Sequence, residues 1–213
     1  MSNVKSGPRP TLRAERAAVT RRRIAEAARA LFSQQGYGAT TLTAIAVEAG
    51  VAVQTVYAVY GSKAGILRAL REEVLRQPEA EALYEGAIQA PSAERKVALF
   101  ARSIRRRWEY GHDVVAIHAD AASTDPTLRI EVDQVLAIRR AGIGRLAQSL
   151  VPRLAASVDV ARATAILDSL TLPEVYREFV DVQGWTPDEF EAWLDSTLRQ
   201  QLLGGLARHA SAS

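Results

Sequence analysis

The chain has 213 residues, 48% of them apolar, which is enough for one large folded domain or two small ones. It has no cysteine, which excludes disulfides, thiolate nucleophiles and cysteine-ligated zinc and suits a reducing cytoplasm. The net charge of +3 is uneven: residues 1–63 carry nine basic and three acidic side chains, whereas residues 64–213 are mildly acidic. This asymmetry indicates either a polyanionic partner for the N-terminal region or simply a charged tail.

The sequence shows no targeting or membrane segment. Residues 1–10 are polar and lack the apolar stretch of a signal peptide. No run approaches the roughly 20 apolar residues that a membrane span needs. We therefore expect a soluble, cytoplasmic protein.

Helical periodicity begins after residues 1–13, which read as a disordered basic arm. The first helix carries an apolar stripe at helical spacing and ends at two glycines; the stripe is Ile24, Ala27, Ala28, Leu31 and Phe32. A second helix follows Thr41, a plausible N-cap, and stops at Gly50. A third spans Val53 to Tyr60 before Gly61. Residues 14–62 thus predict a three-helix domain.

Longer helices follow in residues 63–205, before a flexible tail at 206–213. We predict them at 63–77, 92–111, 114–122 and 125–151, then from 159 with a break at Pro173. Thr186 and Glu189 form a capping box that opens the last helix. No period-2 run or hairpin signal occurs, so the sequence predicts an all-α protein of about nine helices.

The second and third helices, joined by the turn Ala49 to Ala52, have the form of a helix-turn-helix. On the outer face of the third helix, Gln54 can pair with adenine and the methyl group of Thr55 can contact thymine. Tyr57 lies at the edge of the buried stripe, where its hydroxyl can reach a phosphate. Lys63 begins the next helix and is a second phosphate candidate.

The stretch TRRRIAEAARALFSQQGYGATTLTAIAVEAGVAVQTVYAVYGSKAGILRAL resembles the DNA-binding domain of the tetracycline-repressor (TetR) family. The C-terminal run LPEVYREFVDVQGWTPDEFEAWLDSTLRQQLLGG looks like the tail of many actinobacterial-type members. Three positions depart from the family pattern. Ala52 replaces the usual Ser or Thr cap, Gln54 stands where glycine is common, and Tyr60 replaces phenylalanine.

The resemblance implies a homodimer that binds a near-palindromic DNA operator through two recognition helices and releases it when a small-molecule effector binds the larger domain. The candidate DNA-binding residues are Thr41, Gln54, Thr55, Tyr57, Lys63 and Arg22. Arg22 and its neighbours either approach DNA or form a solvated face. The segment from Lys5 to Arg16 is a further candidate, for the minor groove.

The resemblance also places an effector pocket among the middle helices. The candidates are Trp108, Tyr110, His112, His118 and Tyr176, with core packing or surface exposure as the alternative for each. Arg105 to Arg107 are interpreted as a solvated face, although one arginine could meet an acidic ligand. A last apolar set is either a core stripe or, as the resemblance favours, the dimer interface: Phe190, Trp193, Leu194, Leu198 and Leu202.

Three functional classes compete at this stage. The first is a ligand-responsive repressor, and the second is a DNA-binding protein that senses no small molecule, such as an architectural protein or an activator. The third, an enzyme, is disfavoured because the chain has three histidines, no cysteine and none of the common catalytic motifs. For the same reasons we expect no metal site and no cofactor.

Overall fold

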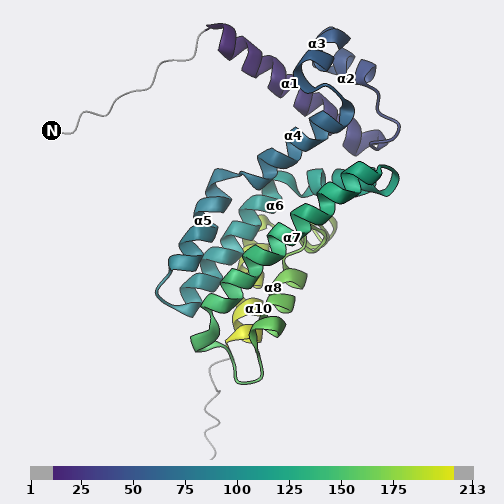
Figure 1. The fold of residues 1–213 in the computed structure, drawn as a ribbon. Coiled ribbons are helices and arrows are strands. Elements are labelled where there is room, and N and C mark those ends of the chain that lie inside the picture. Colours follow the sequence, from purple (N-terminus) through teal and green to yellow (C-terminus); the bar gives the residue numbers. More distant parts are fainter. Residues whose placement is uncertain (1–11, 204–213) are drawn as a thin grey trace, which may run out of the picture. The chain divides into compact units, whose positions relative to one another are not determined.

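A computed structural model of the chain describes residues 12–203, and this part contains α-helices and two short irregular helices but no β-strand. The predicted all-α class is confirmed (Figure 1). The α-helices are α1 (Leu12–Gln35), α2 (Leu42–Ala49), α3 (Val53–Tyr60), α4 (Lys63–Leu75), α5 (Pro78–Gln89), α6 (Ala93–Thr124), α7 (Pro126–Ser149), α8 (Val160–Leu170), α9 (Pro173–Arg177) and α10 (Pro187–Leu202). The predicted tail at 206–213, and all of the predicted arm except its last two residues, lie outside the described residues. Those two, Leu12 and Arg13, already belong to α1.

The chain divides into two compact units, one up to Leu70 and the other from Arg71 onward. The division falls inside α4, eight residues beyond the boundary that we predict at residue 62. Within residues 12–203, no single helix is both long and apolar enough to cross a membrane. Only α2 and α3 taken together pass that test, and they are bent by 106° relative to each other.

The first unit is a small helical bundle. Its core is formed by one apolar face each of α1, α2 and α3 together with the start of α4, as the helical spacing predicts. The side chains that fill it are at most 7% exposed: Ile24, Ala27, Ala28, Phe32, Ile45, Ala46, Val56, Ile66 and Leu67.

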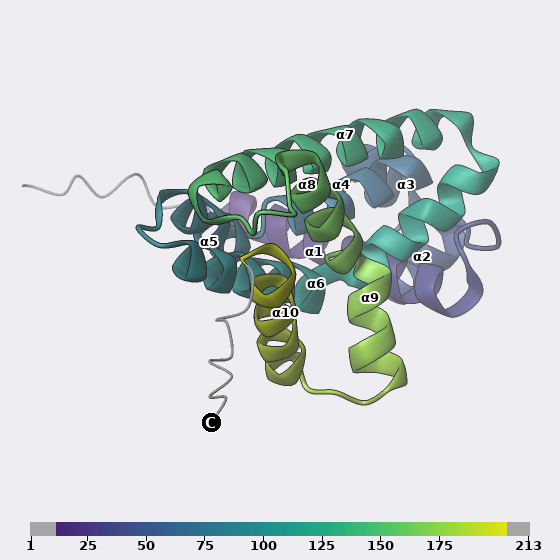
Figure 2. The same ribbon diagram turned by 90° about the horizontal axis from the view of Figure 1, so that it is seen from below.

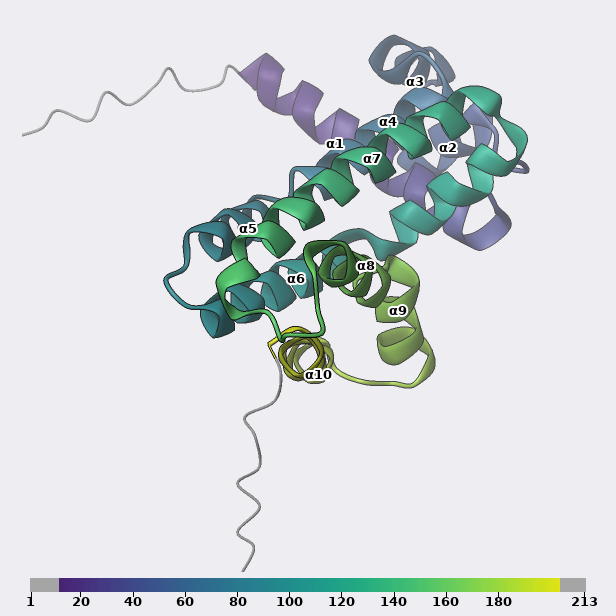
Figure 3. The ribbon, with the colours of Figure 1, turned by 60° about the horizontal axis from the view of Figure 1, so that its bottom comes forward.

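The second unit is built around α6. The helices α5 and α7 pack beside α6 and touch each other (Figure 1). Figures 2 and 3 show α8, α9 and α10 gathered on one side of α6, where α10 contacts both α6 and α8. Large side chains of this core are almost wholly buried, among them Phe100, Trp108, Tyr176 and Phe190.

The predicted helices 92–111 and 114–122 correspond to the two parts of α6. These parts meet at a kink, where Gly111 has non-helical torsion angles (φ −161°, ψ 31°). A Cβ atom added to Gly111 would lie 2.2 Å from Val74 Cγ2, so the absence of a side chain lets α4 approach the bend. The break predicted at Gly111 is thus a kink, and it is also a site of close packing.

The helix α5 is not among the predicted helices. The sequence pattern places Pro78 after the end of the preceding helix, but Pro78 occupies the first turn of a new one. Proline is well tolerated at that place because its missing N–H has no partner within the helix. The Gln77 side chain caps α5 by accepting a hydrogen bond from the Ala80 N–H, at 2.5 Å. Pro173 likewise opens α9, which continues into a short π-helical segment, η2 (Glu178–Val182).

Candidate nucleic-acid interface

The helices α2 and α3 form a helix-turn-helix whose turn is fixed by hydrogen bonds. Thr41 caps α2, with its hydroxyl accepting from the Ala44 N–H at 3.1 Å. Gly50 ends α2 in the left-handed conformation (φ +63°), which favours glycine. The N–H groups of Gly50 and Val51 then bond the carbonyl oxygens of Val47 and Ala46. This turn sets the 106° bend between the two helices.

One face of α3 is buried and the other is open. Val56 is wholly buried, whereas Gln54 is exposed and Tyr57 retains 56% of its accessible surface. Thr55 is half-buried at the margin between the two faces. No side chain caps the helix, since Ala52 has none that can accept a hydrogen bond. The short helix thus presents polar side chains outward, in a form that a DNA major groove about 12 Å wide accommodates.

Arg21 and Tyr60 attach the end of α3 to α1. The Tyr60 hydroxyl donates to the Arg21 carbonyl oxygen at 2.9 Å, and the Arg21 guanidinium lies 5.0 Å from the centre of the Tyr60 ring. Arg21 also donates to the Val59 carbonyl oxygen at 3.4 Å. The neighbouring Arg22 has an exposed side chain, 3.7 Å from Glu26, and remains available to a phosphate. Of these two neighbours, Arg21 therefore has a structural role, whereas Arg22 is solvated.

Lys63 is tied into the loop that precedes α2. Its Nζ donates to the carbonyl oxygens of Tyr37, Gly38 and Thr40 at 2.5, 3.3 and 2.9 Å. The ammonium group also lies 4.2 Å from the centre of the Tyr37 ring, and burial lowers the pKa of Lys63. Because an ammonium has three N–H donors, a phosphate would compete with these bonds. In the structure Lys63 holds the loop that positions Thr41, a role that its sequence position did not reveal.

Three of the five effector candidates lie together. Trp108 and Tyr176 are buried, and Trp108 Nε1 donates to the Thr171 carbonyl oxygen at 3.0 Å. His112 links them: its Nδ1 is 2.8 Å from the Trp108 carbonyl oxygen, and its ring centre is 5.2 Å from that of Tyr176. Burial is the main cause that raises the pKa of Tyr176 to about 12. Trp108 and Tyr176 thus belong to the core, as the alternative interpretation has it, whereas His112 is only partly buried.

Beside the cluster lies a small pocket with room for about one water molecule. It is open to solvent and is lined by His112, Ala116, Pro173, Glu174 and Arg177. Of the five effector candidates, only His112 lines it. Sites for drug-sized ligands usually measure about 300–1,000 Å³. The pocket as it stands is thus smaller than a typical effector site.

The other two effector candidates lie elsewhere. Tyr110 is 41% exposed, with its hydroxyl 3.5 Å from a Glu73 carboxylate oxygen. His118 is buried, and its Nε2 is 3.1 Å from Arg71 Nη1, which also bonds the Glu131 carboxylate at 2.9 Å. Arg71 therefore connects α4 to α6 and α7 through a polar contact that sequence spacing could not indicate.

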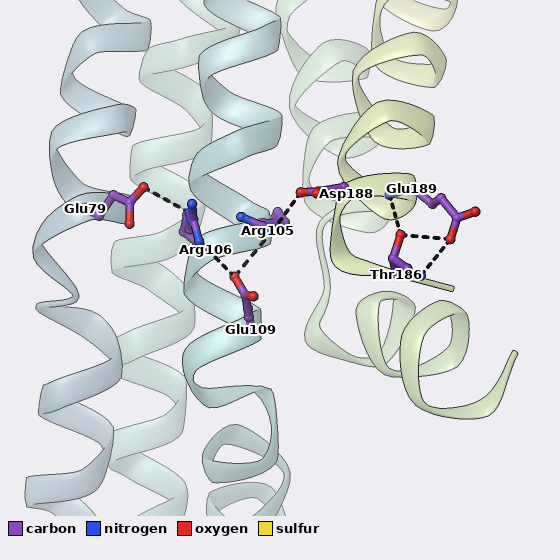
Figure 4. A network of polar contacts seen from close by, with 7 residues as sticks. All are labelled: Glu79, Arg105, Arg106, Glu109, Thr186, Asp188 and Glu189. Carbon is purple, nitrogen blue, oxygen red and sulfur yellow. Dashed lines mark hydrogen bonds and ion pairs between the residues drawn. The ribbon is translucent and has the colours of Figure 1, made fainter. Parts of the chain in front are cut away.

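The interpretation of Arg105 to Arg107 as a solvated face is wrong. Arg105 is 8% exposed and pairs with Asp188 at 2.8 Å and with Glu109 at 3.5 Å (Figure 4). Arg106 pairs with Glu79 and Glu109, while Arg107 donates to the Leu75 carbonyl oxygen at the end of α4. The three side chains thus join α6 to α10, α5 and α4 in turn.

The prediction of a dimer interface on α10 is also wrong for most of its residues. Within a single chain these side chains have no exposed surface left for a partner: Phe190, Leu194, Leu198 and Leu202. They form the core stripe that was the alternative interpretation. Trp193 is half-buried and stacks at 4.4 Å from Phe179, so it alone of the set stays a candidate for contact with a second subunit.

The comparisons with known proteins agree with this geometry. Residues 24–70 match the family model described as bacterial regulatory proteins, tetR family. No curated protein sequence matches the chain.

Solved structures show the same fold over nearly the whole chain. The fatty acid degradation regulator FadR from Bacillus halodurans has 18% identity and a TM-score of 0.69, over 95% of this chain and 98% of that one. NalD, the secondary repressor of the MexAB-OprM multidrug efflux pump in Pseudomonas aeruginosa, has 22% identity and a TM-score of 0.69, over 90% and 100%. The regulator FadR from Bacillus subtilis, solved in complex with stearoyl-CoA, has 19% identity and a TM-score of 0.67, over 87% and 98%.

Proposed function

Because the N-terminal domain of this chain belongs to the tetR family of bacterial regulatory proteins, we propose that the protein is a sequence-specific transcriptional regulator. In this proposal it is a cytoplasmic repressor without enzymatic activity, and a small-molecule effector releases it from its DNA operator. The exposed outer face of α3 carries the proposal, since Gln54 and Tyr57 point away from the core of their unit. A helix with one buried face and an open polar face is suited to enter the major groove.

The roles of the outer side chains follow from their chemistry. Gln54 is assigned to a base edge, where an amide can make two hydrogen bonds to adenine, and Thr55 to a thymine methyl group. Tyr57, Thr41 and Arg22 are assigned to phosphates, which position the protein without reading sequence. Lys63 is also assigned to a phosphate, but to bind one it must give up a hydrogen bond to one of its three carbonyl oxygens.

We further propose that the protein binds DNA as a homodimer through the outer faces of α8 and α10. Small exposed residues recur every four positions on both helices: Ala161, Ala165 and Ser169 on α8, and Ala192 and Ser196 on α10. Such faces allow two helix pairs to approach closely. A twofold dimer places two copies of α3 in successive major grooves, so the operator is expected to be nearly palindromic.

The dimer is tested by changing this face. The double variant Ala165→Glu and Ser196→Glu introduces like charges and should sediment as a monomer in analytical ultracentrifugation. The control Ala82→Glu changes an exposed alanine of α5 and should leave the mass at that of the dimer. A wild-type protein that sediments as a monomer at micromolar concentration would refute the proposed dimer.

Selection of bound sequences from random duplex DNA tests the DNA-reading role. The wild-type protein should enrich one near-palindromic site. Gln54→Ala should relax the preference at one position of each half-site by about 1–3 kcal/mol, whereas the control Gln134→Ala, on α7, should not. If the wild-type protein binds no duplex preferentially at low salt, the proposed function is wrong.

The effector is proposed on the precedent of the Bacillus subtilis structure that holds stearoyl-CoA. A regulator that senses no small molecule is the second candidate, favoured by the small volume of the pocket beside His112. Adding stearoyl-CoA, coenzyme A as control and a panel of apolar compounds to the operator assay separates the two. Weaker operator binding with one compound supports the effector, and by linkage DNA must weaken that compound's binding equally. An affinity that no compound changes supports the second candidate.

A further inference from the structure

The first turns of α1 extend beyond the core of their unit. The helix has 24 residues, but its first buried side chain is Ile24. Every residue from 12 to 19 is exposed. At a rise of 1.5 Å per residue, these eight residues form a helical extension about 12 Å long. Figures 1 and 3 show this end of α1 continuing past α2 and α3.

The extension begins where α3 packs on α1. Arg21 contacts the last turn of α3, at Val59 and Tyr60. Two residues further, the Arg23 guanidinium lies against Gly50, at the turn that precedes α3. The last turn of α3 and the turn that precedes this helix therefore meet α1 at residues 21–23, and residues 12–19 lead away from these contacts.

The face of α1 that meets the core carries arginine on the extension. Residues 24, 27 and 31 lie on that face. Toward the N-terminus, steps of three or four residues continue the same face through 20 and 17 to Arg13, and Arg16 follows Arg13 by about one helical turn. Arg13 and Arg16 are both exposed, and among the described residues neither forms an ion pair within 4.0 Å. Glu15, the acid of the extension, lies on another side of the helix. The extension thus presents two cations on the side where α2 and α3 lie.

We propose that Arg13 and Arg16 bind the phosphate backbone of the duplex that flanks each operator half-site. The inference rests on the proposed function, because α3 must first place the protein on DNA. Two exposed guanidinium groups match phosphate in charge and in hydrogen-bonding geometry. The length of about 12 Å corresponds to three or four base pairs at 3.4 Å each, and the proposal places these contacts outside the base pairs that α3 reads. Phosphate contacts carry no sequence information, and the extension therefore lengthens the footprint without changing the preferred site.

The test compares two operator duplexes by titration over a range of salt concentrations. One ends at the outer edge of the half-sites, and the other continues about six base pairs further on each side. Four flanking contacts per dimer should steepen the slope of log K against log salt by about 3.6 on the longer duplex. The double variant Arg13→Gln and Arg16→Gln should lose this increment and bind both duplexes with the slope of the trimmed one.

Two further variants separate the contact from general charge and from folding. Arg95→Gln with Arg129→Gln removes two exposed arginines of the second unit and should keep the wild-type dependence on duplex length. Arg13→Lys with Arg16→Lys keeps the charge and should retain most of the increment. All variants should show the wild-type helical circular dichroism, since glutamine and lysine are good helix formers.

The outcomes distinguish this inference from the proposed function. An identical slope on both duplexes for the wild-type protein overturns the flanking contact and leaves operator binding by α3 intact. An equal loss of slope on both duplexes in the glutamine variant also overturns it, because the contact would then lie inside the half-site. A wild-type protein that binds no duplex refutes both.

Discussion

The helices α3 and α10 carry similar apolar spacing in the sequence but differ in what they bury. The stripe of α10 is wholly covered in a single chain, and a capping box begins the helix, with Thr186 and Glu189 bonding each other's backbone N–H groups. In α3 only Val56 is wholly buried, Tyr57 is 56% exposed, and no side chain caps the start. The stripe of α10 thus stabilises its own unit, whereas α3 leaves one face exposed.

The largest expected effect lies in α10. Leu194→Ala leaves a cavity in the second unit and should lower the free energy of unfolding by about 2–5 kcal/mol. Tyr57→Ala, which truncates an exposed side chain of α3, should change it by less than about 0.5 kcal/mol. Urea unfolding at one protein concentration measures both. Equal losses would contradict the contrast between the two helices.

The next prediction compares two lysines, one in each unit, that differ in how many hydrogen bonds they donate to the backbone. Lys63 donates three hydrogen bonds to backbone carbonyls, and Lys96 of α6 donates one, to Ile88. Lys63→Met should therefore cost about 1–2 kcal/mol of unfolding free energy, and Lys96→Met distinctly less. Hydrogen exchange should locate the loss of protection for Lys63→Met at the start of α2. A smaller cost at Lys63 than at Lys96 would show that its carbonyl contacts do not hold the loop.

A third contrast concerns buried and exposed tyrosines at alkaline pH. Burial raises the pKa of Tyr176 to about 12 in the folded protein, above the ordinary value of 10 in the unfolded chain. The unfolded state therefore loses this proton first. Stability from this group is complete below pH 10 and declines as the pH rises toward 12. At pH 11 the decline should be about 1.4 kcal/mol.

The variant Tyr176→Phe removes that decline, so its stability should fall less than that of the wild-type protein between pH 9 and 11. Tyr57→Phe is the matched control, because the Tyr57 side chain is exposed. The measurement is urea unfolding at several alkaline pH values. The same change of slope in both variants would contradict the role of burial at Tyr176.

The smallest expected effects are at the helix starts. Thr186→Ala removes the cap of α10 and should lower stability by about 1 kcal/mol. Ala52→Ser supplies the cap that α3 lacks and should raise it by about 0.5–1 kcal/mol. Thermal unfolding measures both changes in stability: the midpoint temperature should fall for Thr186→Ala and rise for Ala52→Ser. A destabilised Ala52→Ser protein would mean that the turn before α3 cannot accommodate a capping side chain.

The sequence predicted α1 to α3 well, because their spacing, caps and glycines are local signals. Gly50 and Thr41 act as expected, and so does the open face of α3. Elsewhere a local signal misled: Pro78 was taken as a stop although it starts α5. Gly111, by contrast, marks the kink in α6 where the sequence predicts a break. Proline is locally compatible with the end of one helix and the start of the next, and the packing of neighbouring helices selects one.

The helical class, the helix-turn-helix and the polar outer face of α3 could all be predicted from the sequence, since they follow from periodicity within a few turns. Three features became known from the folded chain: Lys63 ties a loop, Arg105 is buried against Asp188, and the α10 stripe is core. They could not be predicted because the partner of a long or apolar side chain is set by whichever helix packs against it. Arg105 and Asp188 are 83 positions apart in the sequence, and no local pattern encodes their contact.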